Sequence, residues 1–219
     1  MTAPAETLGC TTWAPKGFSG SPNILVFLHG LGGEGASMYR ALQHALPRNL
    51  PSDFLLVAPD APIIMPHGGC AWYYQIKDDT IRLPLLMESL KTLHTFLQEL
   101  VSDLNPKSIC LAGFSQGGTV SVSYPLVYPY NHVDYFGCFS GYVPLDLPIA
   151  SPLESGYGRF LWGHGTQDYE NPYRLAEIGL NTLRSLGVTP THLHAPIGHT
   201  MAPEWLERLF AEWGVTCFT

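Results

Sequence analysis

The sequence is poor in charged residues, which make up only 13% of its 219 positions. Its 11 lysines and arginines are outnumbered by 18 aspartates and glutamates, the formal net charge is −7, and no run of basic residues occurs. Because nucleic-acid binding requires clustered positive charge to neutralise phosphates, we expect no nucleic-acid partner. A chain with so little charge must bury much apolar surface or present some of it to a ligand or partner.

Paired cysteines and targeting signals are also lacking. The five cysteines are odd in number, widely spaced and form no Cys-x-x-Cys pair: Cys10, Cys70, Cys110, Cys138 and Cys217. This spacing argues against a disulfide framework and favours reduced thiols. The N-terminal sequence MTAPAETLGC has neither the basic nor the apolar region of a secretory signal, and no stretch is apolar for long enough to span a bilayer. We therefore expect a cytoplasmic protein without a transmembrane segment.

The chain instead has a regular alternation of short apolar runs and helical patterns. Continuous apolar runs predict strands buried on both faces at residues 23–30, 54–62, 108–114, 135–141, 159–165 and 191–198, with a shorter run at residues 8–13. Apolar residues at steps of three and four predict helices over residues 83–100, 175–186 and 205–213, the last two ended by Gly187 and Gly214.

Such an alternation predicts an α/β fold in which a mostly parallel sheet is covered by helices on both faces. No linker, internal repeat or low-complexity segment interrupts it, so we expect residues 1–219 to form a single domain. In open sheets of this kind, binding and catalytic sites form beyond the carboxyl ends of the strands. The residues that follow each apolar run are therefore the candidates for chemistry.

The third run ends in GFSQGG, which places Gly113, Ser115 and Gly117 in a Gly-x-Ser-x-Gly pattern. In a nucleophile elbow, the serine lies on a strained turn between a strand and a helix, and the N-terminus of that helix favours negative charge. Glycines are needed where the strand and the helix approach closely. A glycine-rich turn without a catalytic role is the competing interpretation. The apolar run before the motif and the helix expected after it favour the elbow.

A serine hydroxyl needs a base to become a nucleophile, and the base needs an acid to orient it. In hydrolases with such an elbow, the acid and then the histidine follow the serine along the chain. Asp168 follows the fifth apolar run and His199 follows the sixth, so both are expected beside Ser115. Asp146, after the fourth run, is the second choice for the acid.

The other histidines fit structural roles better. His29 and His164 stand at the ends of predicted strands and are expected to brace loops, while His192 and His194 alternate within one run. No His-Glu-x-x-His spacing occurs, so we expect no metal site and no cofactor.

Ester hydrolysis also requires N–H donors aimed at the carbonyl oxygen that gains charge. The backbone of Gln116, the residue after the serine, is expected to supply one donor. The glycines of HGLGGEG, at residues 29–35, let the backbone approach a ligand closely, and Leu31 is the expected second donor. A phosphate-binding loop is the competing interpretation, but the Lys-Ser/Thr pair of such a loop is missing.

Apolar residues near the predicted strand ends suit an acyl chain. They are the candidates for substrate binding: Ile63, Met65, Trp72, Tyr73, Tyr142 and Met201. A place in the core is the competing interpretation for each of them.

The motifs FLHGLGG, GFSQGG, FSGYVP, HGTQD and GHTM together resemble the acyl-protein thioesterase and carboxylesterase family of α/β-hydrolases. The resemblance implies a serine hydrolase without a large lid domain that cleaves carboxylic esters, lysophospholipids or S-acylated proteins through an acyl-enzyme. The family's nucleophile, acid and base then fall on Ser115, Asp168 and His199, and its oxyanion donors on Leu31 and Gln116.

Two segments depart from the family pattern. The sequence AWYYQ has Tyr74 where the family often has an aspartate, and the acid loop continues as DYENP rather than with aliphatic residues and a proline. Acyl length and the choice between ester and thioester therefore do not follow from the sequence. A non-catalytic acyl- or lipid-binding receptor on the same fold is the alternative function. The low charge also leaves open a homodimer or contact with a membrane surface.

Overall fold

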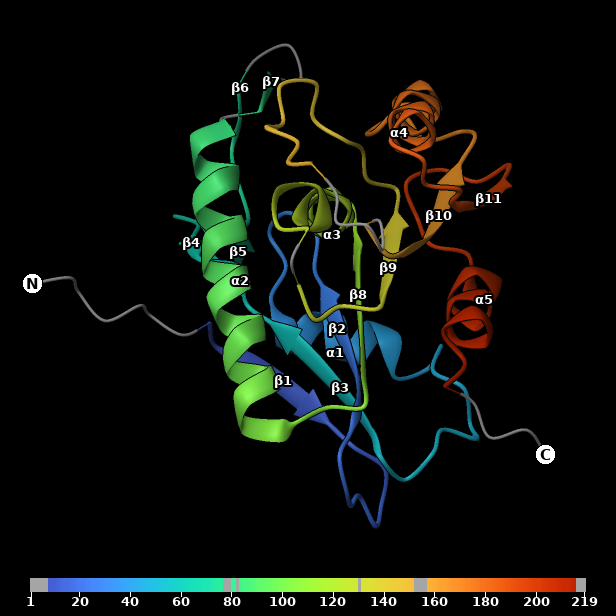
Figure 1. The fold of residues 1–219 in the computed structure, drawn as a ribbon. Coiled ribbons are helices and arrows are strands. Elements are labelled where there is room, and N and C mark those ends of the chain that lie inside the picture. The colour runs from blue at the N-terminus through green and yellow to red at the C-terminus, as the bar shows by residue number, and fades with distance from the viewer. Residues whose placement is uncertain (1–7, 77–79, 82, 130, 152–156, 216–219) are drawn as a thin grey trace, which may run out of the picture.

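A seven-stranded sheet runs through the middle of the molecule in the order β1-β3-β2-β8-β9-β10-β11 (Figure 1). The structure is a computed structural model and describes residues 8–76, 80–81, 83–129, 131–151 and 157–215. The strands of this sheet are β1 (Cys10–Trp13), β2 (Asn23–Leu28), β3 (Phe54–Pro59), β8 (Ser108–Phe114), β9 (Tyr135–Phe139), β10 (Arg159–Gly165) and β11 (Thr191–Ala195). The helices are α1 (Gly35–Leu42), α2 (Leu83–Leu104), α3 (Gln116–Val127), α4 (Tyr173–Ser185) and α5 (Pro203–Trp213).

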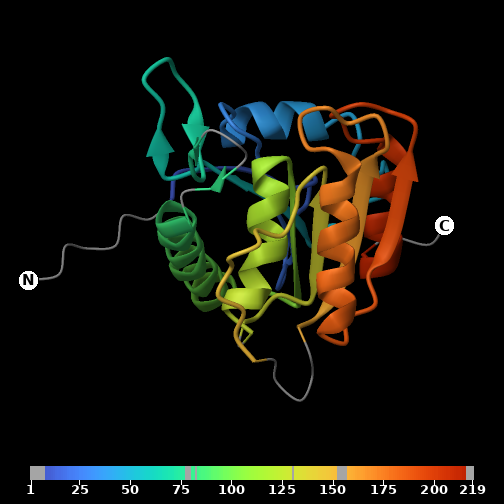
Figure 2. The same ribbon diagram turned by 90° about the horizontal axis from the view of Figure 1, so that it is seen from above.

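All pairings in this sheet are parallel except that of β1 with β3. Helices α2, α3 and α4 cover one face and α1 and α5 cover the other (Figure 2). Burial on both faces explains why the central strands are continuous apolar runs in the sequence. The expected α/β fold, a mostly parallel sheet with helices on both faces, is confirmed, and the described residues include no large lid domain.

The register brings the ends of the central strands to one edge. Leu28 at the end of β2 pairs with Gly113 of β8, and Phe114 pairs with Phe139 at the end of β9. Gly163 of β10 lies beside Phe139 in turn. The loops that follow these four strands therefore meet above the same edge of the sheet, and they carry the residues singled out in the sequence.

All the apolar runs predicted as strands form strands, although several overrun the observed ends by two or three residues. The structure adds elements that the sequence did not predict: α1 and the two-residue strands β4 (Ile63–Ile64), β5 (Cys70–Ala71), β6 (Gln75–Ile76) and β7 (Thr80–Ile81). Helix α1 depends on tertiary contact, because the Gly35 N–H donates to Asp60 Oδ1 at 2.7 Å. A Cβ on Gly35 would lie 2.0 Å from the carbonyl oxygen of Ala58, so this helix start requires glycine.

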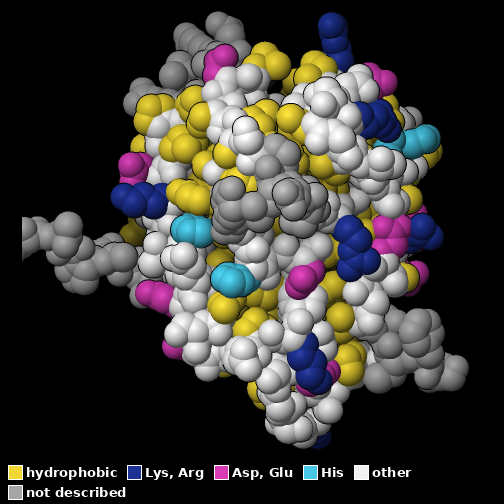
Figure 3. All heavy atoms as spheres, in the orientation of Figure 1, with side chains coloured by type: hydrophobic (Ala, Val, Ile, Leu, Met, Phe, Trp, Pro, Cys, Tyr) yellow, Lys and Arg dark blue, Asp and Glu magenta, His cyan; other side chains and the backbone are white. Residues whose placement is uncertain are grey.

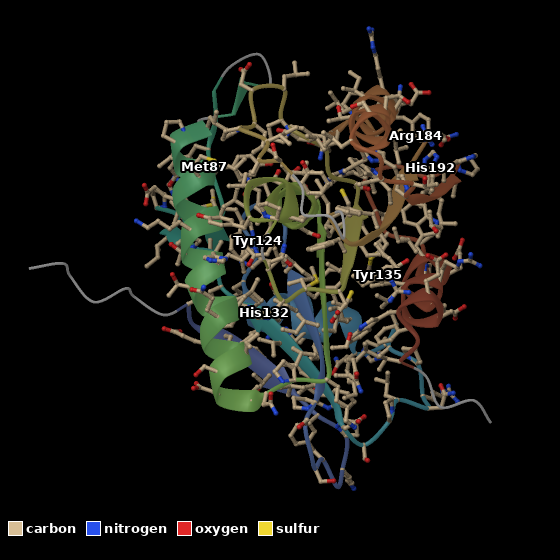
Figure 4. The ribbon with its side chains drawn as sticks, viewed as in Figure 1. Met87, Tyr124, His132, Tyr135, Arg184 and His192 are labelled. Atoms are coloured by element: carbon tan, nitrogen blue, oxygen red, sulfur yellow. The ribbon has the colours of Figure 1, made fainter. Side chains whose placement is uncertain are left out.

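Polar side chains tie the covering helices together and to the sheet (Figure 4). On one side, the Tyr124 hydroxyl of α3 and His94 Nδ1 of α2 lie 2.9 Å apart in a hydrogen bond. On the other side, the Tyr135 hydroxyl of β9 donates to the Glu212 carboxylate of α5. Both tyrosines are almost fully buried, so these bonds satisfy hydroxyl groups that would otherwise be costly to bury.

The described residues show neither a disulfide nor a cluster of potential metal ligands. On the face shown in Figure 3, the basic side chains lie apart from one another rather than in one patch. In the described part of the chain, four cysteines are free: Cys10, Cys70, Cys110 and Cys138. Cys217 lies outside the described residues. No described helix is long and apolar enough to cross a bilayer, and no described group of three potential metal ligands comes together.

The packing of α5 on the sheet gives a prediction for stability. Trp205 is 2% exposed, stacks on Phe139 with ring centroids 6.4 Å apart, and occupies the space left by Gly163, where a Cβ would lie 2.6 Å from the indole. Trp205→Ala should lower the free energy of unfolding, measured by urea denaturation, by about 3–5 kcal/mol because it leaves a large cavity. The exposed Glu207→Ala is the matched control on the same helix; an equal loss in both variants would contradict this packing role.

Candidate active site

Ser115 lies on a strained turn between β8 and α3. Its backbone angles, φ 56° and ψ −118°, are a conformation that non-glycine residues rarely adopt. The turn is held because the Ser115 N–H donates to the Phe139 carbonyl oxygen at 2.8 Å. A Cβ on Gly113 would lie 2.4 Å from the Gly117 backbone, and one on Gly117 would lie 2.2 Å from the Leu28 carbonyl oxygen. Glycine at both positions therefore allows the strand–helix contact that imposes the strain.

A chain of hydrogen bonds joins Ser115, His199 and Asp168. His199 Nε2 lies 2.9 Å from Ser115 Oγ, and His199 Nδ1 lies 2.8 Å from Asp168 Oδ2. Because a carboxylate can only accept, the Nδ1 proton points at Asp168, and Nε2 is left to accept from the serine hydroxyl. The structure thus brings together the three residues expected as nucleophile, base and acid. Asp146, the second choice for the acid, is exposed in the loop after β9.

The Asp168 carboxylate is fully buried and held by its own loop. Its second oxygen, Oδ1, accepts hydrogen bonds from the backbone N–H groups of Glu170 at 3.0 Å and Asn171 at 2.9 Å. Asn171 is itself buried, and its side-chain amide donates to the Ser140 carbonyl oxygen at 2.7 Å. The acid loop is therefore anchored to the end of β9, next to the serine elbow.

His164 also contacts the acid loop and helps to hold it in place. Its Nε2 donates to the Asn171 carbonyl oxygen at 2.8 Å and lies 3.4 Å from Asp168 Oδ2. Burial lowers the pKa of this histidine, although the hydrogen bond to Asn171 and the nearby Asp168 partly offset the shift. A neutral imidazole at this place positions the carboxylate without neutralising it.

His29 braces the loop that follows β2. Its Nδ1 donates to the Gly30 carbonyl oxygen at 2.7 Å, and its Nε2 accepts from the Ala61 N–H at 3.0 Å. Burial lowers its pKa as well, so the ring can keep one donating and one accepting nitrogen. The loops after β2 and β3 are thereby joined.

The glycine-rich loop after β2 lies directly against the serine. A Cβ on Gly30 would be 3.2 Å from the Ser115 Cβ. Within the described residues, neither the Leu31 nor the Gln116 backbone N–H donates to another protein group, and both residues line the cleft at Ser115. Two free N–H groups beside a serine are what an oxyanion site requires. The loop is fastened from outside by Cys70, whose backbone bonds to Gly32 and Gly33 at 2.9 and 2.8 Å.

The side chain of Gln116 clamps the segment before α2. Its Oε1 accepts from the Trp72 N–H at 3.1 Å, and its Nε2 donates to the Tyr73 carbonyl oxygen at 2.9 Å. The Trp72 indole N–H in turn donates to the His29 carbonyl oxygen at 2.9 Å. The sequence motif indicated only the backbone of Gln116. The clamp could not be anticipated, because its partners lie 43 and 44 residues away.

A cleft of about 530 Å³ opens above Ser115. The loop after β2, the elbow and His199 border it, together with Tyr73, Glu170 and Asn171. Glu170 and Asn171 were not among the residues predicted for the site. Their one signal in the sequence was the unusual DYENP continuation of the acid loop.

Of the predicted substrate-binding residues, only Tyr73 lines this cleft. Trp72 is fully buried against His29, with ring centroids 5.6 Å apart, because its indole N–H has a partner in the core. Tyr142 is 7% exposed and also belongs to the interior.

The other three predicted residues are also not among the residues that line the cleft. Ile63 is in β4 and Met65 follows it, in a hairpin that projects from the molecule next to the loop after β2 (Figure 2). Met201 packs against the buried cluster between α5 and the sheet. All three follow strands in the sequence. However, Ile63 and Met65 belong to the hairpin, and Met201 belongs to the packing of α5 on the sheet.

A strained serine between a parallel strand and a helix, followed along the chain by a bonded aspartate and histidine, is the arrangement of an α/β-hydrolase. Residues 18–210 match the phospholipase/carboxylesterase family, and the chain belongs to that family.

The chain is 26% identical over 219 residues to a carboxylesterase, SOBER1, of Arabidopsis thaliana, covering 89% of this chain and 93% of the relative. It is 28% identical to acyl-protein thioesterase 1 of Kluyveromyces lactis over 159 residues, covering 67% and 69%. The crystal structure of esterase PE8 superposes with a TM-score of 0.76 at 23% identity, covering 94% and 97%, and supports the fold. The protein is thus a hydrolase of the carboxylesterase and acyl-protein thioesterase type.

The Gln116 clamp predicts a loss of stability in Gln116→Leu. This change leaves the buried Trp72 N–H and Tyr73 carbonyl without partners, and it should lower the free energy of unfolding by about 2–4 kcal/mol, measured by urea denaturation. Limited proteolysis should cut the segment before α2 sooner. Gln98→Leu, at an exposed position of α2, is the control. Equal stability of the Gln116→Leu variant and the parent would show that the clamp contributes nothing.

The buried neutral histidines predict a loss of stability in acid. Because burial lowers the folded-state pKa of His29 below its ordinary value of 6.5, the unfolded chain takes up a proton that the folded chain does not. The free energy of unfolding should therefore fall as the pH drops below 6.5, by up to about 1.4 kcal/mol per pH unit for each such histidine.

Replacing His29 by glutamine should reduce this slope between pH 6.5 and 5, whatever it does to the overall stability. Above about pH 7, where the ring is neutral in both states, the curves of variant and parent should run parallel. The measurement is urea denaturation at a series of pH values. An unchanged acid slope in the variant would rule out His29 as a source of the effect.

Proposed function

We propose that the protein cleaves carboxylic esters or thioesters through a Ser115–His199–Asp168 triad and an acyl-enzyme intermediate. The observation that carries the proposal is the unbroken hydrogen-bond chain from Asp168 Oδ2 through His199 to Ser115 Oγ. That chain ends at a serine whose cleft also presents the free N–H groups of Leu31 and Gln116.

In the acylation step, Ser115 Oγ attacks the carbonyl carbon of the substrate while His199 Nε2 takes the hydroxyl proton. The carbonyl oxygen gains negative charge and is stabilised by the N–H groups of Leu31 and Gln116. The N-terminus of α3, which begins at Gln116, adds a favourable dipole. When the tetrahedral intermediate collapses, the protonated His199 gives its proton to the departing alcohol or thiol.

In the deacylation step, a water molecule takes the place of the leaving group. His199 Nε2 accepts a proton from the water as its oxygen attacks the acyl carbon, and the proton then passes to Ser115 Oγ as the carboxylic acid departs. Asp168 Oδ2 accepts a hydrogen bond from the Nδ1–H group of His199 throughout and stays ionised, which holds the productive tautomer and stabilises the imidazolium. Its own position rests on the N–H groups of Glu170 and Asn171.

The proposed substrates are acyl esters, lysophospholipids or S-acylated proteins. The acyl-protein thioesterase relative supports including thioesters among them. We also propose a cytoplasmic location, which the four free described cysteines support.

A non-catalytic acyl-binding receptor would need the cleft but not the oriented base. The bonded chain of Asp168, His199 and Ser115 therefore favours the enzyme.

Ser115→Ala should abolish turnover of 4-nitrophenyl acetate and of a matched thioester, and it should remove labelling by a fluorophosphonate probe. Asp168→Asn should lower kcat by roughly 10⁴-fold, by analogy with serine proteases. An asparagine oxygen can still accept from the loop N–H groups, but its NH₂ group then faces His199 and favours the wrong tautomer.

Asp146→Asn, at the other candidate acid, is the matched control and should keep the parent rate. Esterase activity that survives in Ser115→Ala would refute the nucleophile. Full activity in Asp168→Asn together with a large loss in Asp146→Asn would reassign the acid. Ligand binding without turnover across a panel of esters and thioesters would instead support the receptor.

A further inference from the structure

Glu170 differs from every other described residue around the cleft, because it alone carries a permanent charge. The residue is exposed, and its backbone N–H is tied to Asp168 Oδ1 at 3.0 Å. The turn that holds Asp168 therefore also fixes the backbone of Glu170 next to the cleft that contains Ser115 and His199. Because Asp168 is buried and bonded to His199, Glu170 is the carboxylate at the cleft that remains open to a ligand.

Two more carboxylates lie near the loop after β2. Asp60 accepts from the Gly35 N–H, and Glu34 precedes α1. Burial raises the pKa of the Cys70 thiol, and both carboxylates raise it further, so their field reaches the segment that fastens the oxyanion loop. None of the described residues that line the cleft is a lysine or an arginine. Among the described residues that line the cleft, Glu170 therefore sets the sign of the charge.

Aromatic rings accompany the Glu170 carboxylate. Phe114 lines the cleft with its ring centroid 4.9 Å from that of His199, and Tyr169, the neighbour of Glu170 along the chain, is 90% exposed. Carboxylates and aromatic rings together are the groups with which proteins bind ammonium ions. A glutamate and an aromatic ring that line one cleft, with an exposed tyrosine next to the glutamate in the chain, fit such a ligand.

We infer that the cleft selects esters that carry a positively charged ammonium group near the scissile bond, and that Glu170 is the residue that recognises this charge. The inference rests on the proposed ester hydrolysis at Ser115 and narrows its substrates. A cation on the substrate would also offset the negative field that the oxyanion must otherwise face. Esters with a phosphate or carboxylate close to the bond would be disfavoured for the same reason.

The size of the effect follows from the exposure of Glu170. A solvent-exposed carboxylate attracts a cation a few ångströms away only modestly, so the preference for a cationic ester should be about three- to tenfold. Because mobile ions screen exposed charges, the preference should shrink when the ionic strength rises from about 0.01 M to 1 M. A preference based on shape alone would not respond to salt in this way.

Acetylcholine and 3,3-dimethylbutyl acetate form a suitable pair of substrates, since they have the same shape and differ by one positive charge. The readout is the ratio of their kcat/KM values. The parent should favour acetylcholine, and Glu170→Gln should lower the ratio by about three- to tenfold. Glu177→Gln, which removes the same charge from an exposed position of α4, should keep the parent ratio.

A parent ratio of one or less, or a ratio that Glu170→Gln leaves unchanged, would overturn the inference. Binding of tetramethylammonium, followed by NMR shifts of the cleft amides, provides a readout that needs no turnover. It should be weaker in Glu170→Gln than in the parent, and equal binding would also overturn the inference. The Ser115→Ala variant tests ester hydrolysis separately, so failure of the proposed function is distinguishable from failure of the charge preference.

Discussion

Close backbone contact between β8, α3 and β2 is the constraint on which the site depends. Gly113 and Gly117 leave no room for side chains, and this contact forces Ser115 into backbone angles that few residues adopt. Strain of this kind costs about 1–3 kcal/mol and persists only where the surroundings impose it. Here the surroundings are the buried parallel strands, whose register also brings the other loops to the same edge. The sheet thus supplies both the strain and the meeting point.

Buried polar side chains hold the loops that the sheet brings together. His164 and Asn171 fix the acid loop, while His29 and the side chain of Gln116 fix the loops after β2 and β3. Each of these groups makes at least one hydrogen bond inside the protein, which offsets much of the cost of burying its polar atoms. Such networks keep donors and acceptors in fixed directions, and an oxyanion site needs donors that do not have to reorganise during the reaction.

Local patterns were enough to predict the strands, the elbow and the loops that carry Asp168 and His199, because each is encoded within a few consecutive residues. The order of acid and base along the chain followed from the elbow motif. The side-chain contacts of Gln116 and Asn171 could not be predicted, since each joins segments that lie 31 or more residues apart. Trp72 was expected at the substrate and lies in the core, because an indole N–H with a buried acceptor can be enclosed. Sequence position shows which loop a residue is on, but not which way its side chain faces.

In the proposed mechanism, the acid loop separates the groups that hold the acid from the side chains that are exposed. Asp168 is held through the backbone N–H groups of residues 170 and 171, and backbone donors are present whatever side chains those positions carry. The side-chain amide of Asn171 donates a hydrogen bond to the Ser140 carbonyl oxygen, whereas the side chains of Tyr169 and Glu170 are exposed to solvent. They can therefore change without moving the carboxylate. This is the physical reason why the segment DYENP can depart from the pattern of the family while the triad geometry is kept, and why differences in substrate are most easily encoded there.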